Sequence, residues 1–597
     1  MLRTISSILS LIVSTICFGN IDSTTTEVLD TQKLVIINPE IIENIDTLII
    51  SSTLLSPEED VFTPSLYSVG SGLYNFPIKI DLNDYGWFSK NIMLTYEHIK
   101  FNSDTVPKLI SKYDHANNSA HWFTAKFDRM IGKSKLSVKL NRNSQKNLYP
   151  SSIKEGSIGK KFNFLIGSEI PLVNNYVLTL SYFRNQALIK DNGGYSDADS
   201  ILSNYKFNEI FLRSNLSSAS NFSSIFSQKA SVLQKLKIGP AINMDLKSSF
   251  EENKFSFTLL EEGISSNFFS NIFLDSTETF DSVGFKKIVI RPLLKLGKLK
   301  KKGQPILTFG ANKEFNDKSI LNNSYTQGKL NFEVFKNPVS VSGKYHFENI
   351  WKGNYTLKSN VNLLFKKESR DTIIYISQIN LNLDYKNELP SYLFINYFGN
   401  HFKWENNFQP IKNIKFQTDF KLKKLNGLIS FEVQNVSNYI YFNENSIPEQ
   451  TQENITAGNF SLKKQLRIKN IKLFSGIGYQ FSTSNLIRVP SFYTRNNLVY
   501  QFKLRKVPFN VGSNFSYFNK YIGLNYNPAL RHYYLGNQTV GGTPVVDFFM
   551  ASRLGPADVY IKYENVFYNF KTDLFLGENY PVTFSLLRLG LKWNLIN

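Results

Sequence analysis

The last strand-length segment of the chain alternates apolar and polar side chains, and this pattern limits what the chain can form. Leu587, Leu589, Leu591, Trp593 and Leu595 fall on one face of an extended strand, because successive strand side chains point to opposite faces. Arg, Gly, Lys and Asn residues occupy the other face. An apolar row of this length must be covered, either by a protein core or by lipid around a barrel with a polar interior.

The same alternation recurs upstream, which favours lipid as the cover. From about residue 76 onward, alternating segments are separated by turns rich in Asn, Ser, Gly and Lys. Four examples are Gln378–Tyr385, Ile414–Leu422, Leu498–Arg505 and Ala557–Glu564, and each approaches the roughly 9–11 residues of a tilted membrane strand. The pattern predicts an all-β fold, a transmembrane antiparallel β-barrel of roughly 20–26 strands. Longer polar connections, expected as surface loops, are 191–203, 265–282, 443–456 and 525–543.

Other fold classes fit the sequence less well. The chain lacks the continuous apolar strands of packed α/β domains and the blade-length repeat of a propeller. After the N-terminal segment, no run of about eighteen apolar residues indicates a membrane helix. Aromatic residues make up 14% of the chain, in keeping with the aromatic girdles of a barrel exterior.

The N-terminus predicts export. Residues 1–19 have the features of a signal peptide, with Arg3 before an apolar stretch and small residues near the expected cleavage site after Gly19. An alternative is a lipoprotein acylated at Cys17. Cleavage after Gly19 would remove the only cysteine, so we expect no disulfide and no thiol nucleophile in the mature chain. Residues 20–60 are predicted to be a periplasmic or flexible segment, and residues 61–597 the barrel.

The formal charge of +20 has two explanations. It can reflect a basic lumen or a surface lying against anionic lipopolysaccharide, or simply a composition rich in Lys, Asn and Ile. The basic residues are spread along strands, so no nucleic-acid partner is expected. The six histidines show no metal-ligand spacing. His115, His121 and Asp114 come nearest to a cluster, and we expect them to be ordinary loop residues. No catalytic or cofactor motif is evident, so an enzyme is not predicted.

Several short segments of the C-terminal third resemble one known family. The matching pieces are Phe431–Phe442, Gly541–Asp547, Lys562–Asn565 and Arg588–Trp593, with Leu66–Gly70 near the start of the barrel. They resemble the putative porin family of Bacteroidetes and related Gram-negative bacteria. This resemblance implies a multi-pass barrel in the outer membrane with diffusion-channel activity, and it carries no catalytic or binding residues to transfer.

The closing strand also resembles the C-terminal signal strand of outer-membrane barrels. Arg588, Gly590, Trp593 and Leu595 stand where that signal has a polar residue, a glycine and two apolar or aromatic residues. The chain departs from the pattern in ending Leu-Ile-Asn rather than on an aromatic residue. The resemblance implies that these four residues are an assembly signal read by the barrel-assembly machinery.

The charged residues on the polar strand faces are the candidate functional residues. Rings of lumen cations favour the passage of anions, although such residues can also be no more than the wet face of a strand. The candidates for lumen-facing cations are Lys415, Lys421, Lys423, Lys503, Arg505, Arg588 and Lys592.

The leading functional prediction is an outer-membrane porin for passive diffusion of small hydrophilic solutes, with a preference for anions. One alternative is a plugged uptake receptor or transporter, because barrels of about 22 strands usually have a filled lumen. Residues 21–75 are too few for a globular plug, so loops would have to form it. Another alternative is a structural or surface-interaction barrel. Expected partners are outer-membrane lipid and lipopolysaccharide, the assembly machinery, small solutes and, by analogy with trimeric porins, further copies of the chain.

Overall fold

The computed structural model of the protein describes most of the chain from residue 101 onward. The described residues are 101, 106–116, 120–146, 158–190, 193–194, 221–260, 268–297, 305–369, 372–422, 425–567, 575–577, 580–581 and 585–596. The predicted signal peptide, the segment 20–60 and the start of the predicted barrel domain lie outside these residues.

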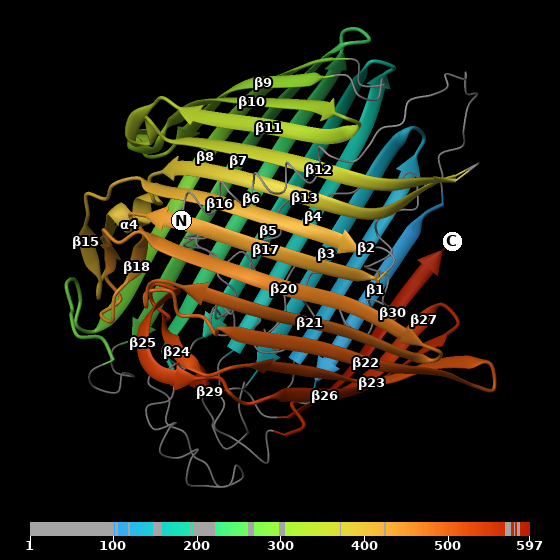
Figure 1. Ribbon diagram of the computed structural model, residues 1–597. Coiled ribbons are helices and arrows are strands. Elements are labelled where there is room, and N and C mark those ends of the chain that lie inside the picture. Colours follow the sequence, from blue (N-terminus) through green and yellow to red (C-terminus); the bar gives the residue numbers. More distant parts are fainter. Residues whose placement is uncertain are drawn as a thin grey trace, which may run out of the picture.

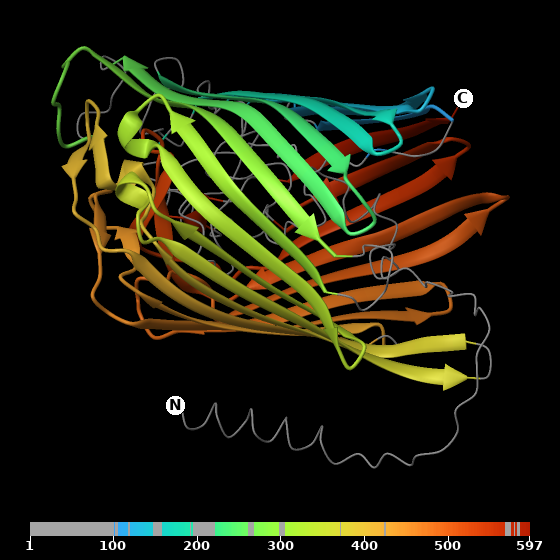
Figure 2. The same cartoon turned by 90° about the horizontal axis from the view of Figure 1, so that it is seen from above.

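Twenty-two of the described strands form one antiparallel barrel, and the barrel is closed because β1 pairs with both β2 and β30 (Figure 1, Figure 2). This confirms the predicted fold class. No helix among the described residues has the length and apolar composition needed to cross a bilayer. In chain order, the barrel strands are β1 (Lys108–Ala116), β2 (Ala120–Ile131), β3 (Ser134–Lys146), β4 (Ile158–Val173), β5 (Tyr176–Lys190), β6 (Asn221–Lys237), β7 (Ile242–Leu260), β8 (Glu278–Leu296), β9 (Ile306–Asn316), β10 (Asn323–Val334), β11 (Asn337–His346), β12 (Tyr355–Ser369), β13 (Thr372–Glu388), β16 (Ile411–Leu422), β17 (Gly427–Ser437), β20 (Ile455–Ile468), β21 (Ile471–Ser482), β22 (Phe492–Leu504), β23 (Val507–Phe518), β26 (Val545–Leu554), β27 (Ala557–Glu564) and β30 (Leu586–Ile596).

The two faces of the wall follow the alternation in the sequence. On β30, the four leucines and the tryptophan of the apolar row are exposed on the outer face, while Arg588 on the other face is fully buried. On β22, Leu498, Tyr500 and Leu504 are likewise exposed. In a membrane, lipid covers these outward side chains. The sequence periodicity therefore fixes which face of each strand looks into the lumen.

The two ends of the barrel differ. One end carries short turns, such as Gly132 between β2 and β3 with φ +59°, and the C-terminal end of β30. The other end carries most of the long connections, and we assign it as extracellular because outer-membrane barrels have short periplasmic turns and longer extracellular loops. β7 and β8 contain 19 residues each, well above the roughly 9–11 needed to cross a bilayer. Their extracellular ends therefore rise above the membrane.

The long connections contain secondary structure of their own. Between β13 and β16 lie α4 (Tyr392–Ile395), β14 (Asn396–Phe398) and β15 (Lys403–Glu405). The next extracellular connection holds β18 (Ile440–Phe442) and β19 (Pro448–Gln450), and a later one holds β24 (Tyr521–Asn527) and β25 (His532–Val540). Figure 1 shows these pieces gathered at the end of the barrel opposite the C-terminus. Smaller pieces are η7 (Ser319–Leu321), η8 (Asn349–Trp351), β28 (Phe575–Gly577) and β29 (Tyr580–Pro581).

Candidate functional site: the loop cap and the lumen wall

The extracellular loops form one buried apolar cluster, which we call the loop cap. Most of its loop side chains come from the connection between β13 and β16, where Phe394 is fully buried and Trp404 is 6% exposed. Tyr397 and Trp404 stack with ring centroids 4.8 Å apart, and Phe394 lies 5.4 Å from Phe442. The buried loop members of the cap are Leu393, Phe394, Tyr397, Phe402, Trp404, Ile440, Phe442, Ala529 and Leu530.

The loop cap rests on inward-facing side chains of two separate parts of the wall. One part is the extracellular half of β5, β6 and β7, and the other is the extracellular end of β16, β17 and β20. Strands β8 to β13 lie between them in the barrel order, so the cluster reaches across the mouth of the lumen. The wall residues beneath the cap are Ala187, Ile189, Ile225, Phe255, Phe257, Leu259, Ile411, Val436 and Ala457.

A polar contact, which we call the latch, fastens the cap to the segment before β8. Asn400, at the tip of the β14–β15 hairpin, is 1% exposed. Its side-chain Oδ1 accepts hydrogen bonds from the backbone N–H groups of Leu274 and Asp275, both at 2.9 Å. Its Nδ2 donates to the Asp275 carbonyl at 2.8 Å and to the Thr279 hydroxyl at 2.7 Å. Its backbone N–H also donates to Asp281 at 2.8 Å.

His401 extends the latch with a second set of contacts. Its ring nitrogens lie 2.8 Å from the Thr279 hydroxyl and 2.8 Å from the Asn271 carbonyl. The ring stacks on Phe269 with the centroids 4.1 Å apart and the planes 12° apart. Both polar and apolar contacts therefore join two loops that are more than 120 residues apart in the chain.

The backbone at the tip of this hairpin leaves no room for a larger residue. A Cβ atom added at Gly399 would lie 2.6 Å from a carboxylate oxygen of Asp281 and 2.9 Å from the Tyr397 hydroxyl. Burial, with a smaller contribution from the Asp281 carboxylate, raises the pKa of Tyr397 far above its usual range. Tyr397 therefore stays a neutral phenol at physiological pH. On the exposed side of the latch, hydrogen bonds from Thr277 lower the pKa of Asp275.

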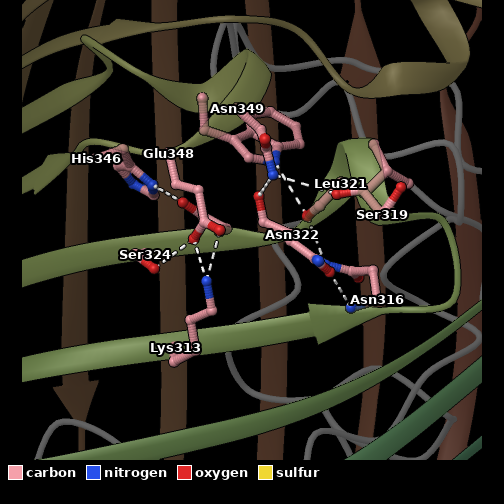
Figure 3. A network of polar contacts seen from close by, with 11 residues as sticks. Lys313, Asn316, Ser319, Leu321, Asn322, Ser324, His346, Glu348 and Asn349 are labelled. Carbon is pink, nitrogen blue, oxygen red and sulfur yellow. Dashed lines mark hydrogen bonds and ion pairs between the residues drawn. The ribbon is translucent and has the colours of Figure 1, made fainter.

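A second polar network lies on the extracellular rim beside the cap (Figure 3). It joins the connection between β9 and β10 to the connection between β11 and β12. Asn349 Nδ2 donates to the Asn322 carbonyl at 3.0 Å. The Glu348 carboxylate accepts hydrogen bonds from Lys313 and Ser324, and these bonds lower the pKa of Glu348. The network holds neighbouring rim loops in fixed positions.

The wall of the lumen carries a continuous chain of ion pairs where the barrel closes. Arg588 Nη2 lies 3.0 Å from the Glu564 carboxylate, which also lies 3.0 Å from Lys562 Nζ. Lys562 Nζ in turn lies 2.9 Å from Asp547. The Arg588 guanidinium sits over the Trp122 ring, 5.3 Å from its centroid. Buried charges of this kind are tolerated only when they are paired, so this part of the wall is fixed and close to neutral.

The same part of the wall explains the glycine in the closing strand. Gly590 lies opposite Asp114 on β1 and opposite Tyr560 on β27, and Tyr560 donates a hydrogen bond to Asp114. A Cβ at Gly590 would lie 2.0 Å from the Tyr560 ring. Glycine is therefore required for packing here. Asp114 is also paired with Lys112 at 3.2 Å.

The structure places the predicted lumen-facing lysines of one strand as follows. Lys415 is on β16 and pairs with Glu432 of β17 at 2.7 Å. Lys421 lies on the same face of β16, and Lys423 lies outside the described residues. Because Lys415 is neutralised by its partner, it contributes little net charge to the lumen. A selectivity role for these residues stays a prediction.

The remaining predicted residues differ in their positions. Lys503 is exposed near the periplasmic end of β22, whereas Arg505 lies beyond the strand, in the turn, with φ 53°. Arg588 is the ion-paired residue described above, and Lys592 lies opposite Lys112 of β1. Trp593 and Leu595 face outward. A selectivity role for the four cations stays a prediction, as does recognition of the closing strand by the assembly machinery.

One group of lumen cations could not be found from the sequence alone. Tyr325 on β10 accepts a hydrogen bond from Arg291 of β8 at 2.8 Å, and Lys344 Nζ of β11 lies 4.2 Å from the centroid of its ring. Lys247 of β7 is directly opposite Arg291. We call these four residues the Tyr325 group. On its own strand, each of these residues is one polar side chain on the lumen face. Only the register between strands brings them together.

The histidines with the closest spacing do not share a site with the nearby aspartate. His115 and His121 pair across the β1–β2 hairpin with ring centroids 4.7 Å apart. Asp114 is on the other face of β1, inside the barrel, with Lys112 and Tyr560. Within the described part of the chain, no group of three or more His, Cys, Asp or Glu residues could hold a metal ion.

Comparisons with known proteins agree with this architecture. The model of a family described as "Putative porin" matches residues 123–597. The search of curated proteins found no match.

Three solved structures with the same fold are named as receptors. The ferric enterobactin receptor of Pseudomonas aeruginosa aligns with a TM-score of 0.58 at 10% identity, covering 83% of this chain and 81% of that one. The siderophore receptor PirA of Acinetobacter baumannii gives 0.57 at 10% identity with the same coverage. The ferric-catecholate import receptor Fiu of E. coli K12 gives 0.53 at 11% identity, covering 83% and 82%. At these identities the likeness establishes the fold alone.

Proposed function

The chain belongs to the putative porin family and is a barrel of the Gram-negative outer membrane, and from this we propose that it is a channel for small hydrophilic solutes whose extracellular mouth is narrowed by the loop cap. The observation that carries the proposal is the cap itself, a single buried cluster that touches two parts of the inner wall. The polar inner face below the cap suits water and hydrophilic solutes. The latch at Asn400 would set how often the cap lets solutes pass.

We further propose that the channel prefers anions and that the Tyr325 group supplies the preference. Lys344 lies within Coulombic range of Arg291 and Lys287, which concentrates positive charge on one part of the wall. Carboxylates in the same area offset part of it: Glu314 and Glu388 lie near Lys344, and Glu251 forms an ion pair with Lys287 at 3.2 Å. A local excess of cations lowers the barrier for negative solutes.

A second candidate is a receptor that takes up a larger ligand bound at the extracellular end. Two observations favour it. The described loops reach across the mouth of the lumen, and a ferric enterobactin receptor and a siderophore receptor share the fold. In this case the barrel would stay closed to ions until the cap moved.

We also propose that Arg588, Gly590, Trp593 and Leu595 take part in recognition by the barrel-assembly machinery. Trp593 and Leu595 are on the outer face of the strand that closes the barrel, where another protein can reach them during insertion. Contact with lipid follows from the fold, whereas contacts with small solutes or with further copies of the chain are part of the proposal.

The test is conductance of the refolded protein in planar bilayers. The informative variant replaces residues 392–405, which contain α4 and the β14–β15 hairpin, with a short Gly/Ser linker. A control variant shortens residues 348–353 of the rim, which contribute no residue to the cap. We expect the wild type and the control to give the same small conductance, and the shortened cap to give a larger conductance with fewer closures.

Three results would decide between the candidates. Silence of both the wild type and the cap variant would refute a channel. Silence of the wild type with conduction by the cap variant would favour the receptor. Equal conductance of all three proteins would refute a role of the cap in narrowing the mouth.

A further inference from the structure

A groove lies on the outer face of the barrel, on the opposite side of the wall from the lumen. Its volume is about 630 Å³, within the range of small-molecule binding sites. It runs across the extracellular halves of β2 to β6. The outward-facing residues that line it are His121, Arg142, Ser144, Lys160, Phe162, Gln186, Leu188, Ser224 and Phe226.

The strand register shows that the groove faces the membrane. Arg142 on β3 is opposite Phe123 of β2, which is exposed on the outer surface, and opposite Phe162 of β4. Lys160 is opposite Ser144, one step further toward the extracellular end. From Arg142 toward the periplasm, the outward residues of β3 are Leu140, Val138 and Leu136. The groove thus has cations at its upper edge and an apolar surface directly below them.

The height of the groove matches the outer edge of the bilayer. Arg142 lies eight residues beyond Ser134, where β3 begins at its periplasmic turn. Gln186 lies ten residues beyond Tyr176, where β5 begins. A tilted strand needs about 9–11 residues to cross the membrane, so both side chains reach the level of the outer head groups. A cation on the outer face is much less costly near an interface than at the midplane of the bilayer.

Two cations of the groove, Arg142 and Lys160, form no ion pair with any acidic residue that the structure describes. Ion pairs of nearby lysines, such as Lys126 with Asp128, lie on the inner face. Arg184 does not line the groove; it lies opposite Phe164 and sits over the Phe226 ring at 5.4 Å. Like charges on adjacent strands repel, and an anion placed between them would remove that repulsion.

We infer that this groove binds a phosphorylated glycolipid of the outer leaflet. Its phosphate would lie against Arg142 and Lys160, with Ser144 and Gln186 available as hydrogen-bond partners for phosphate or sugar. Its acyl chains would run over Leu140 and the neighbouring apolar residues toward the periplasm. A soluble anion would use only the cations, whereas a lipid matches both the charge and the apolar surface beneath. This inference does not depend on the proposed channel function.

The test is native mass spectrometry of the purified barrel with a bis-phosphorylated glycolipid of the lipid A type. The test variant is Arg142→Ala with Lys160→Ala. The matched control for the arginine is Arg129→Ala, which removes an exposed arginine from the outward face of β2 at its periplasmic end. Heat-dependent mobility on gels checks that each barrel is folded. Parallel titrations use the dephosphorylated glycolipid and inorganic phosphate.

We expect the wild type and Arg129→Ala to retain the phosphorylated glycolipid equally. The double variant should bind it about tenfold or more weakly, because hydrogen bonds to charged groups contribute more than neutral ones. The dephosphorylated glycolipid should bind the folded wild type no better than it binds the double variant. Undiminished binding by the folded double variant would overturn the inference. So would equal binding of the two glycolipids, or binding of inorganic phosphate alone.

Discussion

Replacing Asn400 with alanine should release the loop cap from the segment before β8. The side chain makes four hydrogen bonds there, two as acceptor and two as donor. The substitution removes all four and leaves the backbone of the β14–β15 hairpin in place.

The expected loss of docking free energy follows from these four hydrogen bonds. A hydrogen bond within a protein contributes about 0.5–1.5 kcal/mol net. Leu274 is largely exposed, so water replaces some of the lost hydrogen bonds. We therefore expect the free energy that keeps the cap docked to fall by about 2–3 kcal/mol in all. Since 1.4 kcal/mol is a factor of ten, the equilibrium for undocking should shift by roughly 30–150-fold.

Hydrogen exchange can measure this shift at one informative amide. The Phe273 N–H donates at 2.8 Å to the backbone carbonyl of Asn400, and the substitution keeps that carbonyl. Faster exchange at Phe273 therefore reports undocking of the cap rather than the missing side chain. The control is Asn443→Ala, because the Asn443 side chain bonds only within its own loop. Unchanged exchange at Phe273 in Asn400→Ala would refute the assignment of the latch.

Three further predictions concern the rest of the barrel. Gly590→Ala should destabilise the folded barrel by about 1–3 kcal/mol, because the added methyl collides with Tyr560. Urea unfolding measures this loss. The control is Gly476→Ala, whose methyl meets only ordinary contacts and should leave stability nearly unchanged. The pKa of Glu348 is lowered in the folded protein, so its stabilising contribution is complete above the unfolded pKa and is lost as pH falls through the folded pKa. Hydrogen exchange of the rim should therefore speed up in acid, and Glu348→Gln should remove this pH dependence. An unchanged pH profile in the variant would contradict the prediction. Arg291→Gln should lower the anion preference measured as the reversal potential in a salt gradient, and an unaltered potential would exclude the Tyr325 group as its source.

The sequence was sufficient to predict the wall because the relevant physics is local. Alternation with a period of two assigns each side chain to the lipid or the lumen, and β30 follows the predicted faces residue by residue. The number of strands fell within the predicted range because turn residues mark most strand ends. β7 and β8 are longer than predicted, since membrane thickness does not limit the part of a strand that rises above the bilayer.

The cap could not be predicted in the same way, because it depends on contacts between distant loops. The connection 525–543 was expected to be a polar surface loop, yet Ala529 and Leu530 within it belong to one buried core with Phe394 and Phe442. Clusters of aromatic residues within a polar connection were the available signal, since such residues are costly to leave exposed. Nothing in the sequence pairs Asn400 with residues 274–281, which come close only because the β14–β15 hairpin packs against the segment around the start of β8.

The lumen cations show the same limit. Lys415 lies on a strand whose pattern is clear, but the register places Glu432 beside it. The register also brings Arg291 and Lys344 toward Tyr325 from different strands. The net charge at a point in the lumen therefore depends on which side chains pair across neighbouring strands. The pattern within a single strand does not reveal this pairing.

The most direct test of the central claim is single-channel conductance of the wild type beside the variant in which residues 392–405 are shortened. The two barrels share the same wall, so any difference arises at the mouth. A docked cap that narrows the lumen predicts a larger mean conductance and fewer closures in the variant. Identical conductance in two barrels that are both shown to be folded would contradict the account.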